Sequence, residues 1–211
     1  MNPTPFRTII VTLCLSAAAI SLATVWFGWF GGNDLLVRYS PNFQAIVPTT
    51  ALCFLVLTVA LFGIGNGKDG GNRLAIWCAR FVFGLVGLNM LVRLLAHQDG
   101  LDALLPFWTD LGDRMSYATA ALLILSAFLV RRTATTLNNP PLLLVGGALT
   151  GLTTTGSIAM SHALDVNSPY RLGICDGISA YSLLLFGLVF SALLLIHLTA
   201  PGGAGLFDED Y

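Results

Sequence analysis

Six apolar segments, each long enough to cross a membrane, dominate the sequence; they lie at about residues 8–30, 44–65, 74–96, 115–131, 140–163 and 177–199. A helix needs about 20 mainly apolar residues to span roughly 30 Å of hydrocarbon. No aspartate or glutamate lies inside these segments, and the single lysine, Lys68, lies between the second and the third. The sequence therefore predicts an all-α integral membrane protein with six transmembrane helices.

The composition excludes a water-soluble domain. Hydrophobic residues make up 55% of the chain and charged residues 10%, whereas soluble domains carry about 25% charged residues. The net charge of −1 provides no basic surface for nucleic acid. The expected partners are therefore membrane lipids and another membrane protein, either a second copy of the chain or a larger complex.

The first apolar segment is predicted to be a retained span rather than a cleaved signal peptide. Its uncharged run from Thr8 to Phe30 covers 23 residues, more than the apolar run of about 7–15 residues in a signal peptide. The run ends in the letters WFGWF, and aromatic side chains are typical of the membrane–water boundary.

Three of the segments resemble one another. The stretches QAIVPTTALCFLVLTVALFG, DRMSYATAALLILSAFLVRR and DGISAYSLLLFGLVFSALLL align when Thr50, Thr119 and Ser182 are superimposed. Each follows a longer connector, which predicts three helical hairpin repeats: a span, a long connector, and a span that opens with a hydroxyl residue. The alternative is that helices rich in leucine and alanine resemble one another through composition alone.

The distribution of arginine and lysine predicts that both chain ends face the cytoplasm. Five of these residues would lie on the side of the termini, and four on the other side: Arg7, Lys68, Arg73, Arg131 and Arg132 against Arg38, Arg93, Arg114 and Arg171. Residues 201–211 form a short acidic tail after the last span.

The connector DGLDALLPFWTDLGD, residues 99–113, is predicted to lie in the membrane interface. On a helical wheel its aspartates, among them Asp102 and Asp113, gather on one side, opposite its leucines and Trp108. This pattern indicates an amphipathic helix whose carboxylates face water, or an ordinary lid over the bundle.

A polar stripe at the end of the third segment is the first candidate site. Asn89, Arg93 and His97 are spaced by four residues and so share one helix face. This stripe would suit an anionic ligand or a lipid headgroup. The alternative is a structural role, with a snorkelling arginine and a hydrogen bond from Asn89 to a neighbouring helix.

The fifth segment carries a second candidate, a surface for helix association. Gly147 and Gly151 form a GxxxG pattern, and Thr154 extends this small surface. Small residues let helices approach closely and bond across the contact. The surface would serve either packing inside the bundle or a contact with another protein.

No cofactor, metal or enzymatic activity is predicted. The cysteines show no ligand spacing, no intramembrane lysine is available for retinal, and no catalytic or nucleotide-binding motif occurs. His97 and His162 would lie near the same side of the membrane, which leaves a haem or pigment between them as the one open arrangement.

The repeated helices resemble a known family. The phrases PTTALCFLVLTVALF and RMSYATAALLILSAFLV, and the ending LTAPGGAGLFDEDY, are similar to the hairpin-repeat membrane regions of bacterial sensor histidine kinases and diguanylate cyclases. The resemblance implies a sensory input module in a bacterial inner membrane. It transfers no ligand residues. A receptor of that family continues into an output domain, whereas the sequence given stops at Tyr211. It is expected to be either a fragment of such a receptor or, as the alternative, an accessory or assembly subunit of a respiratory or photosynthetic membrane complex.

Overall fold

The computed structural model describes residues 5–39, 44–65, 69–96, 100–104, 113–136, 142–163 and 177–200. The elements are α1 (Pro5–Ala23), the π-helix η1 (Thr24–Phe30), α2 (Asp34–Val37), α3 (Pro48–Gly65), α4 (Asp69–Ala96), the 3-10 helix η2 (Leu101–Leu104), α5 (Tyr117–Thr136), α6 (Leu142–Ala163) and α7 (Ala180–Thr199). Within the described ranges no strand occurs, and six helical spans are long and apolar enough to cross a membrane. The predicted all-α multi-pass class is confirmed.

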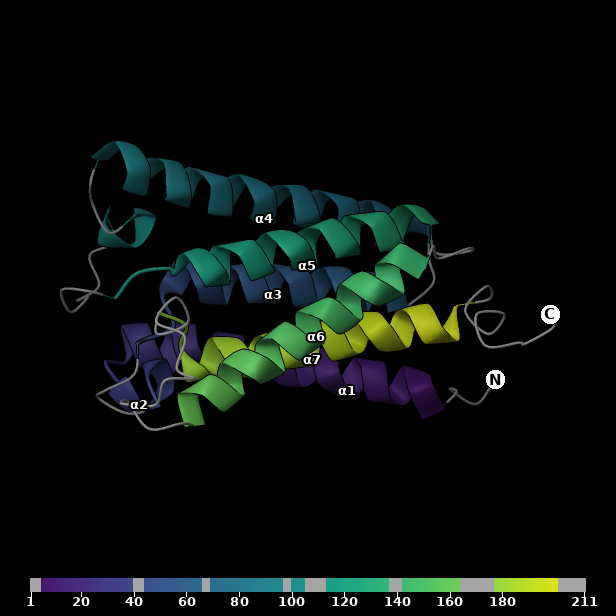
Figure 1. Cartoon of the computed structure of the whole chain (residues 1–211), viewed down its shortest axis with the longest axis horizontal. Coiled ribbons are helices and arrows are strands. Elements are labelled where there is room, and N and C mark those ends of the chain that lie inside the picture. The colour runs from purple at the N-terminus through teal and green to yellow at the C-terminus, as the bar shows by residue number, and fades with distance from the viewer. Residues whose placement is uncertain are drawn as a thin grey trace.

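The three helices with aligned sequences form the centre of the bundle. α3, α5 and α7 contact one another, and each outer helix packs against two of them: α1 against α3 and α7, α4 against α3 and α5, and α6 against α5 and α7 (Figure 1). The buried share is 61%, 56% and 56% for the inner spans, against 28%, 28% and 33% for the outer ones. Each hairpin thus contributes one outer and one inner helix.

The inner helices meet along equivalent positions. From each aligned hydroxyl residue the buried positions advance alternately by four and three residues, the spacing of a coiled-coil core. These sets are Thr50, Thr119 and Ser182; Phe54, Leu123 and Phe186; Leu57, Ser126 and Val189; Leu61, Val130 and Leu193; Ile64, Thr133 and Ile196. The Phe54 and Phe186 rings pack edge to face, with centroids 4.7 Å apart. The repeat therefore determines which face of each helix is buried.

The inner helices begin a few residues later than the apolar segments do. α3 starts at Pro48 rather than near residue 44, because a proline disfavours helical geometry in the residue before it but suits the first helical turn. Ser179 caps α7, with its side chain accepting a hydrogen bond from the Ser182 amide at 3.0 Å. Ser116 does the same for the Thr119 amide in α5, also at 3.0 Å.

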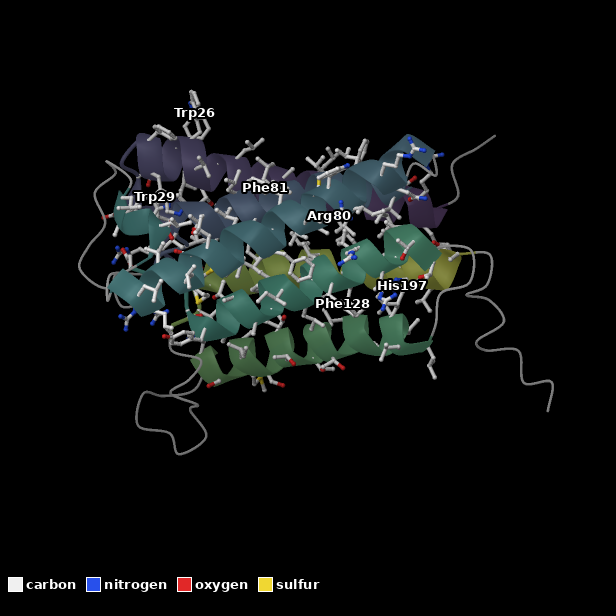
Figure 2. All side chains as sticks on the ribbon, turned by 90° about the horizontal axis from the view of Figure 1, so that it is seen from above. Trp26, Trp29, Arg80, Phe81, Phe128 and His197 are labelled. Atoms are coloured by element: carbon white, nitrogen blue, oxygen red, sulfur yellow. The ribbon has the colours of Figure 1, made fainter. Side chains whose placement is uncertain are left out.

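The two ends of the bundle differ in character. α1 begins and α7 ends at one end, here named the terminal end; α2, η2 and the starts of α3, α5 and α7 lie at the other, here named the capped end (Figure 1). Trp26 and Trp29 lie at the capped end, and His197 lies toward the terminal end (Figure 2). The polar connections between the hairpins are concentrated at the capped end.

Candidate functional site

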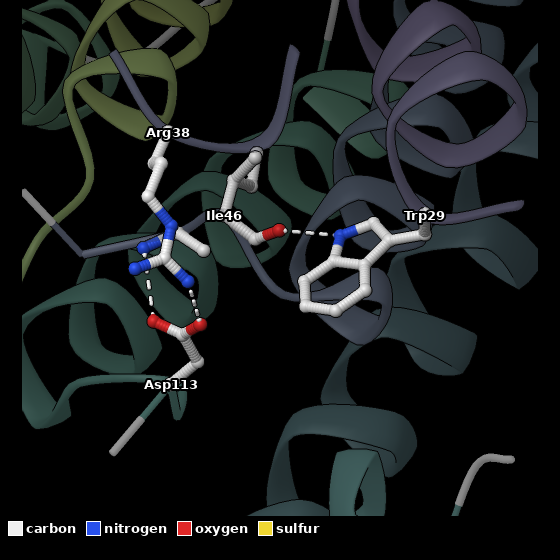
Figure 3. A network of polar contacts seen from close by, with 5 residues as sticks. Trp29, Arg38, Ile46 and Asp113 are labelled. Carbon is white, nitrogen blue, oxygen red and sulfur yellow. Dashed lines mark hydrogen bonds and ion pairs between the residues drawn. The ribbon is translucent and has the colours of Figure 1, made fainter. Parts of the chain in front are cut away.

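A partly buried ion pair joins two connectors at the capped end. Arg38 donates to Asp113 over 2.5 Å, and their side chains are 16% and 6% exposed (Figure 3). The other oxygen of Asp113 accepts a hydrogen bond from the Ala45 amide at 3.2 Å. Nearby, the Trp29 indole donates to the Ile46 carbonyl at 2.8 Å. These contacts fix the segment that leads into α3, so they are structural.

Asp102 caps the start of α3 from a different connector. Its carboxylate accepts hydrogen bonds from the Thr49 amide at 2.9 Å and from the Thr49 hydroxyl at 2.6 Å. The capping position that is serine in α5 and α7 is Val47 here, so the cap is supplied through space.

The prediction that the carboxylates of the 99–113 connector face water is therefore wrong for two residues. Asp102 and Asp113 are 1% and 6% exposed, because the helix start and Arg38 bind them. Asp102 lies in the 3-10 turn η2, and residues 105–112 lie outside the described ranges.

The stability of the bundle should depend on pH through Asp102. Burial raises the pKa of this carboxyl, although the hydrogen bonds from Thr49 oppose the rise. The protonated form is thus favoured by folding. The stability that protonated Asp102 contributes is fully present below the pKa of about 3.9 in the unfolded chain. This stability is lost as the pH rises through the higher pKa in the folded chain. We expect the thermal midpoint of wild type minus that of Asp102→Asn to shrink as the pH rises, measured in non-ionic detergent; a constant difference would contradict the raised pKa.

The polar stripe on α4 is used inside the protein. Asn89 is 1% exposed and accepts a hydrogen bond from the Leu101 amide at 2.6 Å. Arg93 donates to the Met115 carbonyl at 2.8 Å, and its guanidinium lies 4.1 Å from the Tyr117 ring centroid. Both side chains hold the connector between α4 and α5 against α4. His97 lies outside the described residues.

The GxxxG glycines face the interior of the bundle. A Cβ at Gly147 would lie 2.7 Å from Leu129 of α5, and one at Gly151 would lie 2.3 Å from the Phe190 ring of α7. Thr154 instead lies on the exposed side of α6. The three residues of the candidate surface therefore do not share one face: the two glycines pack inside the bundle, and Thr154 faces outward.

The histidines lie far apart along the bundle. His162 lies in the last turn of α6, at the capped end. His197, in the last turn of α7, is fully buried, and its Nε2 lies 2.7 Å from the Thr133 hydroxyl oxygen. Among the described residues, no group of three histidine, cysteine or acidic side chains is arranged to hold a metal. The proposed pairing of His97 with His162 involves a residue outside the described ranges.

A groove between α6 and α7 offers space for a ligand, whereas the predicted polar stripe and the glycine surface are used in internal contacts. Its volume is about 770 Å³, and it is lined by Tyr39, Leu152, Thr155, Gly156, Ala159, His162, Ala180, Leu183, Leu184, Gly187, Leu188 and Ser191. From Ala180 to Ser191 the groove follows α7 for about 16 Å, at 1.5 Å per residue. Tyr39 and His162 lie near its capped end, and Thr155 and Ser191 lie deeper.

Glycines create this groove. A Cβ at Gly156 or at Gly187 would meet nothing within 4 Å. The groove is not predictable from the sequence, because a glycine in an apolar helix is equally suited to close packing, as at Gly151. Only the direction of each glycine separates the two uses.

The groove can hold an elongated, mainly apolar molecule with one polar end, since its walls are largely leucine and alanine and its hydroxyl and imidazole groups are few. No family model, curated protein or solved structure matches the chain.

Proposed function

We propose that the chain is a non-enzymatic sensory input module of a bacterial inner membrane, and that it responds to an amphipathic molecule bound between α6 and α7. The observation that carries this proposal is the groove of about 770 Å³, which falls within the size range of about 300–1,000 Å³ typical of ligand pockets. The family resemblance of the repeated helices supports the sensory role.

The chemistry of the groove supports an amphipathic ligand. Leu152, Leu184 and Leu188 supply apolar walls, while Tyr39 and His162 offer polar atoms near the membrane boundary. An acyl or isoprenoid chain would fill the length of the groove with its polar end toward His162. Because α7 is the span that precedes the C-terminal tail, separation of α6 from α7 by a ligand would reach that end of the chain.

The charges support an orientation with both termini in the cytoplasm. Arg7, Arg73, Arg131 and Arg132 are exposed at the terminal end. At the capped end, Arg114 is exposed and Arg38 is paired with Asp113. Exposed arginines collect on the cytoplasmic side of membrane proteins, so the groove would open toward the outer leaflet.

Filling the groove should abolish ligand binding. Gly187→Leu adds a side chain where a Cβ has open space, so the fold should be retained. The probe is palmitate carrying a photoreactive diazirine, with crosslinks mapped by mass spectrometry. We expect labelling of α6 and α7 in wild type and its loss in Gly187→Leu.

Gly146→Leu is the matched control for this experiment. It also adds a leucine to open space, but Gly146 does not line the groove, so labelling should persist. Equal labelling of all three proteins would refute binding in the groove.

A contact with another membrane protein is the second candidate function, and it corresponds to an accessory subunit. The outward face of α6 carries exposed Thr150, Thr154 and Ser157, and hydroxyl groups in lipid bond to neighbouring helices. Under this function, Thr150→Leu with Thr154→Leu would abolish recovery of a dimer or larger complex, and Gly187→Leu would leave it unchanged. The sensory proposal predicts that Gly187→Leu abolishes palmitate labelling, whereas Thr150→Leu with Thr154→Leu leaves it unchanged.

A further inference from the structure

A basic and aromatic stripe runs along the outward face of α4. Arg73, Trp77 and Arg80 are spaced by four and three residues, which places them on one side of a helix. All are exposed, Trp77 by 66%. This stripe is distinct from the groove, because no α4 residue lines the groove.

Arg80 lies deep along the span. It follows the start of α4 by about 16 Å of helix rise, and its position along the long axis of the bundle is similar to that of Phe128 (Figure 2). A charged side chain at such depth is costly unless it reaches an anion or the interface. This cost applies to Arg80, because its side chain is exposed on the outside of the bundle.

The side chain of Arg80 is directed along the helix toward the terminal end. Its guanidinium carbon lies 5.0 Å from the Trp77 ring centroid, one turn nearer the terminal end, as expected because helical side chains point toward the N-terminus. This direction leads toward the bilayer surface and toward Arg73. It does not lead sideways, toward a second helix at the same depth.

We propose that this stripe binds the phosphate of an anionic phospholipid in the leaflet at the terminal end. Arg73 and Arg80 would bind the phosphate from either side of Trp77, a residue type enriched near membrane boundaries. Charge complementarity identifies the occupant, since lipid phosphates are the anions that this leaflet presents to two exposed guanidinium groups.

The next turns of α4 accommodate the acyl chain. Gly84 and Gly87 are exposed, and a Cβ at either would meet nothing within 4 Å. They follow Arg80 toward the membrane centre, so a chain attached to a phosphate near Trp77 would lie over a surface without side chains. Phe81, 49% exposed, provides an apolar contact beside it.

Native mass spectrometry of the full chain, purified with equal amounts of phosphatidylglycerol and phosphatidylcholine, tests this proposal. Arg80→Gln should reduce retention of phosphatidylglycerol about fivefold, the effect of one arginine near an anionic surface. Arg131→Gln is the matched control, because it removes an exposed arginine of the same end from α5. It should leave retention near the wild-type value.

Three results would overturn the proposal: equal losses in the two variants, equal retention of the two lipids by wild type, or displacement of the lipid by inorganic phosphate alone. Arg80→Lys retains the charge but not the forked donors, and it should retain more phosphatidylglycerol than Arg80→Gln. Unchanged thermal unfolding of the variants would show that lost retention does not follow from a lost fold.

Discussion

Replacing Asp113 by alanine should lower the free energy of unfolding by about 3 kcal/mol, the lower end of the cost of breaking a buried ion pair, because the partly buried Arg38 would lose this counter-ion. The two groups are 2.5 Å apart, and neither is more than 16% exposed. The substitution also removes the acceptor for the Ala45 amide. The two connectors, which are distant in sequence, would therefore lose both the ion pair and the hydrogen bond that join them.

Denaturant unfolding in detergent measures this loss, with Asp34→Ala as the control. Asp34 is an exposed aspartate of the same end, and exposed substitutions typically change stability by less than about 0.5 kcal/mol. Arg38→Met combined with Asp113→Leu should recover part of the loss, since apolar pairs can replace buried ion pairs. If Asp113→Ala and Asp34→Ala are equally stable, the ion pair contributes nothing to folding.

The architecture was predictable because its causes are local in the sequence. Length and apolarity alone define each span, and the hydroxyl residues Thr50, Thr119 and Ser182 mark equivalent turns of three helices. In lipid the buried face need not be the more apolar one, so the repeated register was the better guide to burial. All three residues are at most 3% exposed.

The polar contacts of the connectors were not predictable in the same way. Asp102 binds Thr49, and Asp113 binds Arg38, across 53 and 75 positions of sequence. A helical wheel compares residues within one segment, so it assigned these carboxylates to water. The spacing of Asn89 on α4 likewise does not indicate its partner, the Leu101 amide, which follows only from the fold.

The direction in which each glycine of a helix faces was also not predictable from the sequence. In α6, Gly146 faces open space while Gly147 and Gly151 face neighbouring side chains. The letters GxxxG do not distinguish these environments, so a surface for a protein partner and an internal contact look alike in sequence. Gly151 therefore supports a prediction about folding instead of association.

Gly151→Leu should destabilise the bundle by about 3 kcal/mol, at the upper end of the usual cost of overpacking a core. A Cβ at this position would lie 2.3 Å from the Phe190 ring, and Phe190 is itself fully buried on α7. The Phe190 ring also stacks on the Phe186 ring, whose centroid is 6.0 Å away. Either α6 must move outward or the ring must leave the core.

Gly146→Leu provides the comparison, since it makes the same chemical change on the same helix where a Cβ meets nothing within 4 Å. Its unfolding midpoint should match that of wild type, while that of Gly151→Leu falls. Since α6 also forms one wall of the groove, its outward movement should enlarge that space, and palmitate labelling in Gly151→Leu should change along with stability. Equal midpoints for the two variants would mean that α6 does not pack against Phe190 in the membrane.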